Sequence, residues 1–166
     1  MQIDLGAQLL SLADMPAGTF FITQSAEEPI WGMSAFQSHE KAAVLFSTSP
    51  GTSPYPCVVS ERYMGNALLT ALPDAYFRPS LTRESLQPHY VSPSGPGSIF
   101  LAVGAPYMRV ARGNEGYRYV NLASGEIQSN PPEGGVLHVN EWSVHQLSRG
   151  GAEIELFTFE GPKEFK

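Results

Sequence analysis

The chain has 166 residues with a formal net charge of −6, and 16% of them are charged, against about 25% in an average domain. Its ten lysine and arginine residues are scattered, whereas nucleic-acid binding needs several clustered cations, so we expect no nucleic-acid partner. There is one cysteine, Cys57, which excludes an internal disulfide.

The N-terminal sequence and the distribution of apolar residues indicate where the protein is located. Neither a basic start nor a long apolar run follows Met1, so we expect no signal peptide. No stretch approaches the roughly 18 apolar residues of a membrane helix, which predicts no membrane contact and a cytoplasmic location. The sixteen glycines and fourteen prolines are spread between hydrophobic segments, a pattern typical of many turns between short strands.

The first 75 residues predict a β unit with two helices. Leucines at helical spacing between residues 5 and 12 predict an N-terminal helix. Segments rich in β-branched and aromatic residues predict strands over residues 19–23, 30–36, 42–47 and 58–59. Helical spacing then predicts a second helix over residues 61–72, with Ser60 as its cap and Pro73 at its end.

Residues 76–94, which are rich in proline, predict a connector, and residues 95–166 predict a second β unit. Its predicted strands cover residues 98–103, 107–111, 117–122, 126–128, 136–139, 142–147 and 152–159. A glycine-bounded turn over residues 113–116 predicts a hairpin. Strict alternation in the last strand places Phe157 and Phe159 on the face that carries its glutamates.

The two predicted units share a sequence pattern. The aligned segments are residues 16–22 with 95–101, 29–33 with 106–110, and 42–47 with 118–123. In the first pair Gly18 aligns with Gly97, and Phe21 with Phe100. We therefore predict a mainly β fold of two tandem, related antiparallel β-meanders, each a small or half barrel, packed together with one or two short helices.

Aromatic and arginine side chains on the second unit suggest a binding surface. Tyr107 and Arg109 share one face of a predicted strand, and Tyr117 and Tyr119 share one face of the next. Such residues commonly anchor protein partners, and we add Trp142 to this set; core packing is the alternative. The pattern predicts a non-catalytic protein-interaction or structural module with a protein partner or self-association, and without a cofactor.

Residues His138, Glu141 and His145 carry an alternative hypothesis, because imidazole and carboxylate groups suit zinc, iron or manganese. On one strand His138 and Glu141 would point to opposite faces. A glycine pair before His138 resembles the cupin family, which implies a small barrel with a metal or ligand pocket in the second unit. Cupins also carry a His-x-His pair followed by Glu, and residues 16–60 contain no such motif.

Other catalytic signatures are weak. Cys57 lies in a segment typical of a strand that enters a core, where cysteine behaves as a small hydrophobe rather than as a nucleophile. No serine has the Gly-x-Ser-x-Gly frame of a hydrolase. The sequence therefore predicts no complete catalytic site.

Overall fold

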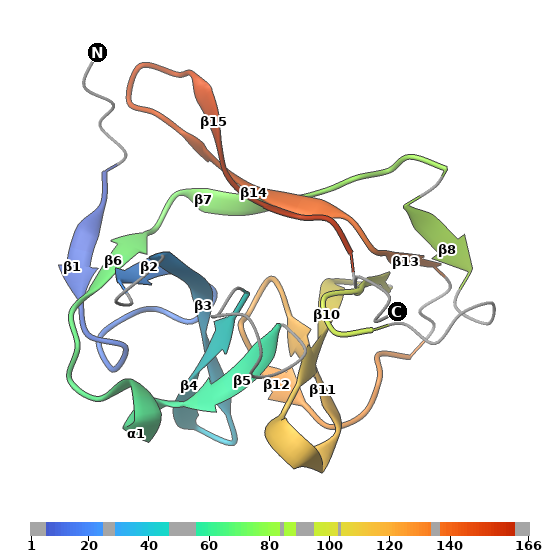
Figure 1. The fold of residues 1–166 in the computed structure, drawn as a ribbon, viewed down its shortest axis with the longest axis horizontal. Helices are drawn as coiled ribbons and strands as arrows, with labels where there is room; N and C mark the ends of the chain where they lie inside the picture. The colour runs from blue at the N-terminus through green and yellow to red at the C-terminus, as the bar shows by residue number, and fades with distance from the viewer. Residues whose placement is uncertain are drawn as a thin grey trace.

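The computed structural model describes residues 6–24, 29–46, 56–83, 85–88, 95–102, 104–133 and 137–161. In these residues twelve strands form one large sheet and three form a small sheet (Figure 1). The prediction of a mainly β fold is confirmed, whereas the finer prediction of tandem meanders in small or half barrels is not. No helix in the described ranges is long and apolar enough to cross a membrane.

The N-terminal part of the large sheet contains six strands that pair antiparallel in the order β1-β6-β2-β3-β4-β5. These are β1 (Gln8–Leu10), β2 (Phe20–Gln24), β3 (Pro29–Gln37), β4 (Glu40–Leu45), β5 (Cys57–Ser60) and β6 (Leu69–Leu72). Strand β6, the last of this part along the chain, lies between β1 and β2, so this part is more than a simple meander.

The C-terminal part of the large sheet also contains six strands, in the order β8-β13-β9-β10-β11-β12. These are β8 (Leu86–Pro88), β9 (Ile99–Leu101), β10 (Pro106–Ala111), β11 (Tyr117–Asn121), β12 (Ile127–Gln128) and β13 (Leu137–Val139). The two parts meet through parallel contacts, one between Cys57 and Ala111 and one between Phe36 and Glu126.

The small sheet lies across the large one (Figure 1) and has the order β15-β14-β7. Its strands are β7 (Ala75–Pro79), β14 (Trp142–Leu147) and β15 (Glu153–Phe159). Because β7 follows β6 and β14 follows β13, each part of the large sheet supplies one strand to this layer.

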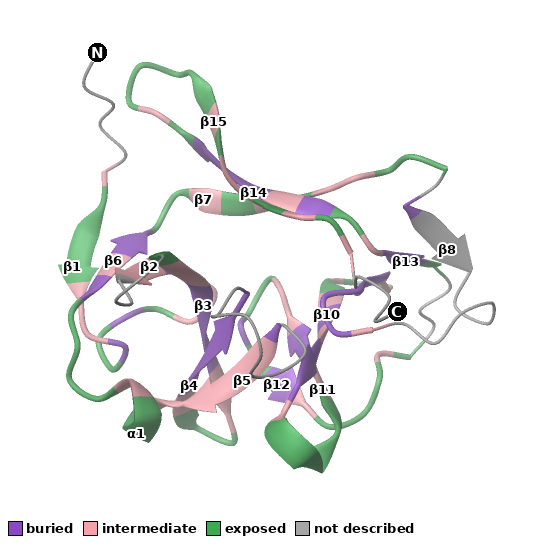
Figure 2. Cartoon of the chain, viewed as in Figure 1, coloured by how far each residue is buried: buried purple, intermediate pink, exposed green. Residues whose placement is uncertain are grey.

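One hydrophobic core fills the space between the sheets and contains residues of both predicted units, including Phe20, Met33, Ile99 and Met108 (Figure 2). Trp142 lies at its centre, where its indole Nε1 donates a hydrogen bond to the Gly97 carbonyl at 2.8 Å. Burial of this apolar surface, at roughly 25 cal/mol per Å², is the main term that holds the layers together.

Both predicted helices are wrong over most of their length. Residues 8–10 form β1, and the second helix ends after a single turn, α1 (Glu61–Met64). Gly65 interrupts that helix with a φ of 61°, and Leu69–Leu72 then pair with β1 and β2 as β6. Burial of Leu69 and Leu72 in apolar clusters on the two faces of the sheet outweighs their helical propensity.

The segment predicted as a connector contains structure of its own. Four of the five residues of β7 lie within this segment, and β8 lies wholly inside it. Residue 84 and residues 89–94 of the segment lie outside the described residues. The two predicted units are thus joined by strands that belong to both sheets.

Candidate functional site

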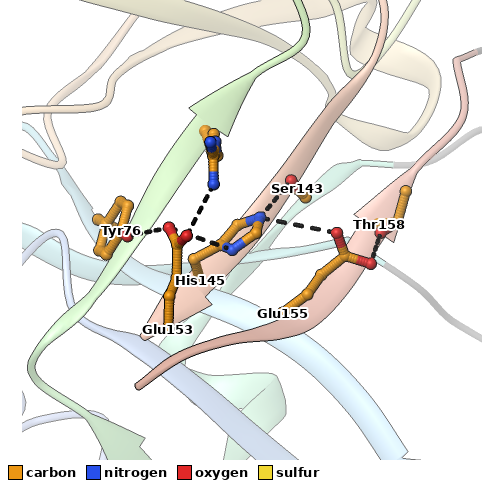
Figure 3. A network of polar contacts seen from close by, with 7 residues as sticks. Tyr76, Ser143, His145, Glu153, Glu155 and Thr158 are labelled. Atoms are coloured by element: carbon orange, nitrogen blue, oxygen red, sulfur yellow. Dashed lines mark hydrogen bonds and ion pairs between the residues drawn. The ribbon is translucent and has the colours of Figure 1, made fainter. Parts of the chain in front are cut away.

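A polar network centred on His145 covers the outer face of the small sheet (Figure 3). His145 lies on the middle strand, β14, and its side chain is 9% exposed. The His145 network contains Tyr76 and Arg78 from β7, Ser143 and His145 from β14, and Glu153, Glu155 and Thr158 from β15. Each strand of the small sheet therefore contributes to one cluster.

Strand register explains why β7 and β14 present these residues together. Tyr76 lies directly opposite His145, and Arg78 lies opposite Ser143. Directly opposed residues on antiparallel strands point to the same face, and residues two apart on one strand do so as well. All four side chains therefore point away from the core.

A β-bulge brings the glutamates of β15 to this outer face. Val144 pairs with Phe157, but the next residue, His145, pairs with Glu155, so Leu156 is an extra residue on β15. A bulge of this kind shifts the side-chain alternation by one position. Phe157 packs on the core while Glu155 faces His145. The prediction that the glutamates and phenylalanines share a face is wrong for this reason.

The His145 imidazole has a partner on each side. Its Nε2 lies 2.7 Å from the Ser143 hydroxyl oxygen and 3.7 Å from Oε2 of Glu155. Its Nδ1 lies 3.5 Å from Oε1 of Glu153. The Tyr76 ring stacks against the imidazole with 6.1 Å between centroids. These contacts fix the plane of the ring.

Glu153 is held by two donors from β7. The Tyr76 hydroxyl donates to its Oε1, and Nη1 of Arg78 donates to its Oε2 at 2.9 Å. The hydrogen bond from Tyr76, with the charge of Arg78, lowers the pKa of the Glu153 carboxyl. The same hydrogen bond raises the pKa of the Tyr76 phenol, because it stabilises the protonated form.

A hollow of about 670 Å³ lies beside the network. Its walls include Arg78, Ser143, His145 and three carboxylates, those of Glu141, Glu155 and Glu160. The hollow is therefore polar and carries more negative than positive charge.

The structure separates the three residues of the metal hypothesis. Glu141 and His145 line the same hollow. His138 lies on β13 of the large sheet, is fully buried, and has its ring 5.9 Å from that of Phe100. Within the described ranges, no group of three His, Cys, Asp or Glu residues is placed to hold a metal ion.

The predicted aromatic surface lies on β10 and β11, on the outer face of the large sheet. Arg109 lies opposite Tyr119, and Tyr107 opposite Asn121, so Tyr107, Arg109, Tyr117 and Tyr119 share one face. We call these four residues the tyrosine–arginine surface. The Arg109 guanidinium carbon lies 3.8 Å from the centre of the Tyr117 ring, which is 41% exposed, and this contact is a cation–π interaction.

Trp142, which we had grouped with these residues, is not part of that surface. Its side chain is 1% exposed and stacks on Phe159 with 5.0 Å between ring centroids. The strand places it on the inner face of the small sheet because it alternates with Ser143. It contributes to stability and is removed from the predicted surface.

The outer face of the N-terminal part is closed in a different way. Phe21, Ala43 and Leu45 form a second apolar cluster there, and Leu12 and Met15 pack on it from the turn after β1. Leu12 is 1% exposed and Met15 is fully buried. The Lys41 ammonium donates to the Met15 carbonyl, which ties the turn to β4. Leu12 and Met15 therefore cover the Phe21 ring on this face.

Sequence reasoning missed six members of the His145 network, Thr158 among them. Ser143 had a usable signal, because it lies two residues before His145 on a predicted strand. Tyr76 and Arg78 lie in a segment interpreted as a connector, and Glu153 and Glu155 reach the site only through the bulge.

Burial raises the pKa of the Cys57 thiol, which disfavours its thiolate.

The comparisons with known proteins provide no further assignment: no protein family, no curated protein and no solved structure matches the chain.

Proposed function

We propose that the protein is a protein-interaction module whose contact site is the tyrosine–arginine surface. The observation that carries this proposal is the shared outer face of Tyr107, Arg109, Tyr117 and Tyr119 on paired strands. Tyrosine and arginine are enriched at the energetic centres of protein interfaces. The acidic composition and the absence of a basic stripe in the sequence favour a protein over a nucleic acid as the partner.

Contacts within the protein hold side chains of the tyrosine–arginine surface in place, which strengthens this proposal. Tyr119 packs edge-on against the buried Phe100 ring, with 5.7 Å between centroids. Arg109 is fixed over Tyr117. Side chains that are ordered before binding lose less conformational entropy when a partner arrives. The surface is therefore suited to a partner that offers an apolar contact and a hydrogen-bond acceptor.

We also propose that the two parts of the large sheet are related copies of one unit, as the sequence pattern predicts. The strand orders correspond one to one, β1-β6-β2-β3-β4-β5 with β8-β13-β9-β10-β11-β12. Registers support the correspondence, because Phe20 lies opposite Met33 and Leu72 while Ile99 lies opposite Met108 and Val139. Met33 thus corresponds to Met108, so the sequence alignment of residues 29–33 is displaced by two.

Contacts between the copies favour an approximate twofold relation. The Phe36 amide donates to the Gly125 carbonyl at 3.0 Å, and the Ala111 amide donates to the Pro56 carbonyl at 2.8 Å. Strands β7 and β14 pair antiparallel around Phe77 and Val144. On this proposal the copies span residues 8–79 and 86–147, and β15 is an addition to the second copy.

The test of the proposed function is a matched set of surface variants. Tyr117→Ala and Arg109→Ala should abolish a complex or self-association detected by sedimentation velocity and by capture from a lysate of cells that express the chain. Tyr63→Ala, which removes a tyrosine that is 80% exposed elsewhere, should leave the complex intact. Absence of any complex with the unaltered protein, or equal losses in all three variants, would contradict the proposal.

A further inference from the structure

We propose that Ser143 is a nucleophile activated by His145, with Glu153 as a positioning residue, and that this site hydrolyses small esters that carry a cationic group. The site lies on the outer face of the small sheet, whereas the tyrosine–arginine surface lies on the large sheet. This activity is therefore additional to the proposed interaction, and its failure would leave that proposal standing.

The distance between nucleophile and base is the first argument. The 2.7 Å between Ser143 Oγ and His145 Nε2 lies within the range of about 2.6–3.2 Å expected for a serine and its general base. With the imidazole proton on Nδ1, Nε2 accepts the hydrogen bond from the serine hydroxyl. Nδ1 then faces Oε1 of Glu153 at 3.5 Å, the side on which a carboxylate stabilises the imidazolium that forms.

The second argument is that neighbouring side chains hold Glu153 and His145 in place. Tyr76 and Arg78 hold both oxygens of Glu153, and Tyr76 also stacks on the imidazole. The three strands hold the backbone, since residues 142–146 pair on both sides. A site whose side chains are held by hydrogen bonds on paired strands is ordered before a substrate arrives.

The reaction has two steps. The Ser143 oxygen attacks the ester carbonyl, its proton moves to Nε2 of His145, and the C–O bond to the leaving alcohol breaks as that proton passes to the alcohol oxygen. Water then attacks the acyl-serine and His145 takes a proton from it. His145 passes this proton to the Ser143 oxygen as the acyl C–O bond breaks, which releases the carboxylic acid. Arg78 lies opposite Ser143, lines the same hollow and has donors beyond the Nη1 bond to Glu153, so we assign it as the donor to the carbonyl oxygen.

The charges around the hollow indicate the substrate class. Glu141, Glu155 and Glu160 line it together with Arg78 as the cation. A substrate with a negative charge would be repelled by this surface, whereas a positive group remote from the ester would be attracted. Small esters of a cationic alcohol fit this requirement.

The experiment uses the full chain with acetylcholine as the cationic ester and 3,3-dimethylbutyl acetate, its uncharged isostere, as the neutral one. We expect acetylation of Ser143, detected by peptide mass spectrometry, and a preference for the cationic ester. Ser143→Ala should remove the acetylation and lower hydrolysis by about 10²-fold or more, and His145→Gln should do the same. Ser129→Ala, which alters an exposed serine elsewhere, is the control. Hydrolysis unchanged in Ser143→Ala, or no acetylation of Ser143, would overturn the proposal.

The role of Glu153 needs a readout that a structural effect would not move. The charged and titratable groups facing His145 are Glu153 and Glu155 from β15 and Tyr76 and Arg78 from β7. Glu153→Gln removes the carboxylate beside Nδ1 of His145, so kcat should fall while KM for acetylcholine stays unchanged. Glu153→Asp should restore part of kcat. A rise in KM with kcat unchanged would show that Glu153 does not act through His145.

Discussion

The outer faces of the two parts of the large sheet show how one strand arrangement can be sealed or left open. On the N-terminal face Leu12 and Met15 close an apolar cluster around Phe21. On the C-terminal face the tyrosine–arginine surface lies on β10 and β11, where Phe100 is buried but Tyr117 is exposed. The difference teaches that the backbone is fixed by the inner face, which leaves the outer face free to differ.

Individual positions make the contrast concrete. Gly32 lies opposite Phe21, and a Cβ at this position would come 2.6 Å from Cζ of the Phe21 ring. The ring therefore lies flat over the strand. Tyr107 lies opposite Phe100 in the other part, and Phe100 instead packs edge-on against Tyr119. One glycine-to-tyrosine difference thus accompanies the change from a closed to an aromatic face.

The largest expected effect comes from opening the sealed face. Leu12→Ala should lower the free energy of unfolding by about 3.5 kcal/mol, because a fully buried leucine leaves a cavity. Tyr117→Ala on the open face should cost below about 1 kcal/mol, since that ring is largely a surface group. Urea denaturation of both variants measures the difference, and similar losses would break the comparison.

The next test of the comparison between the two parts uses two glycines that align in the sequence. Gly18 and Gly97 have φ of 83° and 95°, so alanine strains both by about 1–2 kcal/mol. A Cβ at Gly97 would also overlap the Phe159 ring, whereas at Gly18 its nearest neighbour is the Ala123 carbonyl oxygen at 3.9 Å. Gly97→Ala should therefore cost about 3 kcal/mol and Gly18→Ala about half as much. Equal losses in thermal or urea unfolding would mean that Phe159 moves aside freely.

A smaller effect should come from the contact that joins the two parts. Nη1 of Arg112 donates to Oε1 of Gln37 at 2.8 Å. Arg112→Met keeps much of the side-chain volume and should lower the free energy of unfolding by about 1 kcal/mol. Arg83→Met, at an exposed position, is the control. An equal change in both variants would show that this contact adds nothing between the parts.

The smallest expected effect concerns acid stability of the small sheet. Tyr76 and Arg78 lower the pKa of folded Glu153, so its carboxylate stabilises the fold above the unfolded-state pKa, near about 4.3. That contribution is lost as the pH falls through the folded-state pKa. Glu153→Gln should flatten the loss of stability between neutral and acid pH, while Glu133→Gln should not. Superimposable pH curves for Glu153→Gln and the unaltered protein would exclude this linkage.

Local signals sufficed for much of the strand content and for the shared face of Tyr107, Arg109, Tyr117 and Tyr119. The turn over residues 113–116 and alternation on either side of it predicted the β10–β11 hairpin, which the register confirms. The predicted helix over residues 61–72 is wrong because Leu69 and Ala71 pair with strands that are distant in the sequence. Local residue spacing contains no information about such long-range pairing.

The His145 network depended on information that no local pattern holds. The two-residue spacing of Ser143 and His145 on a predicted strand could have indicated that their side chains share a face. The bulge at Leu156 reverses the faces of Glu153 and Glu155, and bulges leave no strong sequence signal in a strand. Trp142 was misassigned because both a core and an interface favour a large aromatic residue.

The most direct test of the contrast between the two outer faces is site-specific photo-cross-linking in cells that express the chain. A benzophenone amino acid would replace Tyr117 on the open face or, as the control, Tyr63, which is 80% exposed. We predict one discrete cross-linked product at position 117, lost when Arg109→Ala is added, and none at position 63. The same products at both positions, or none at 117, would contradict the account.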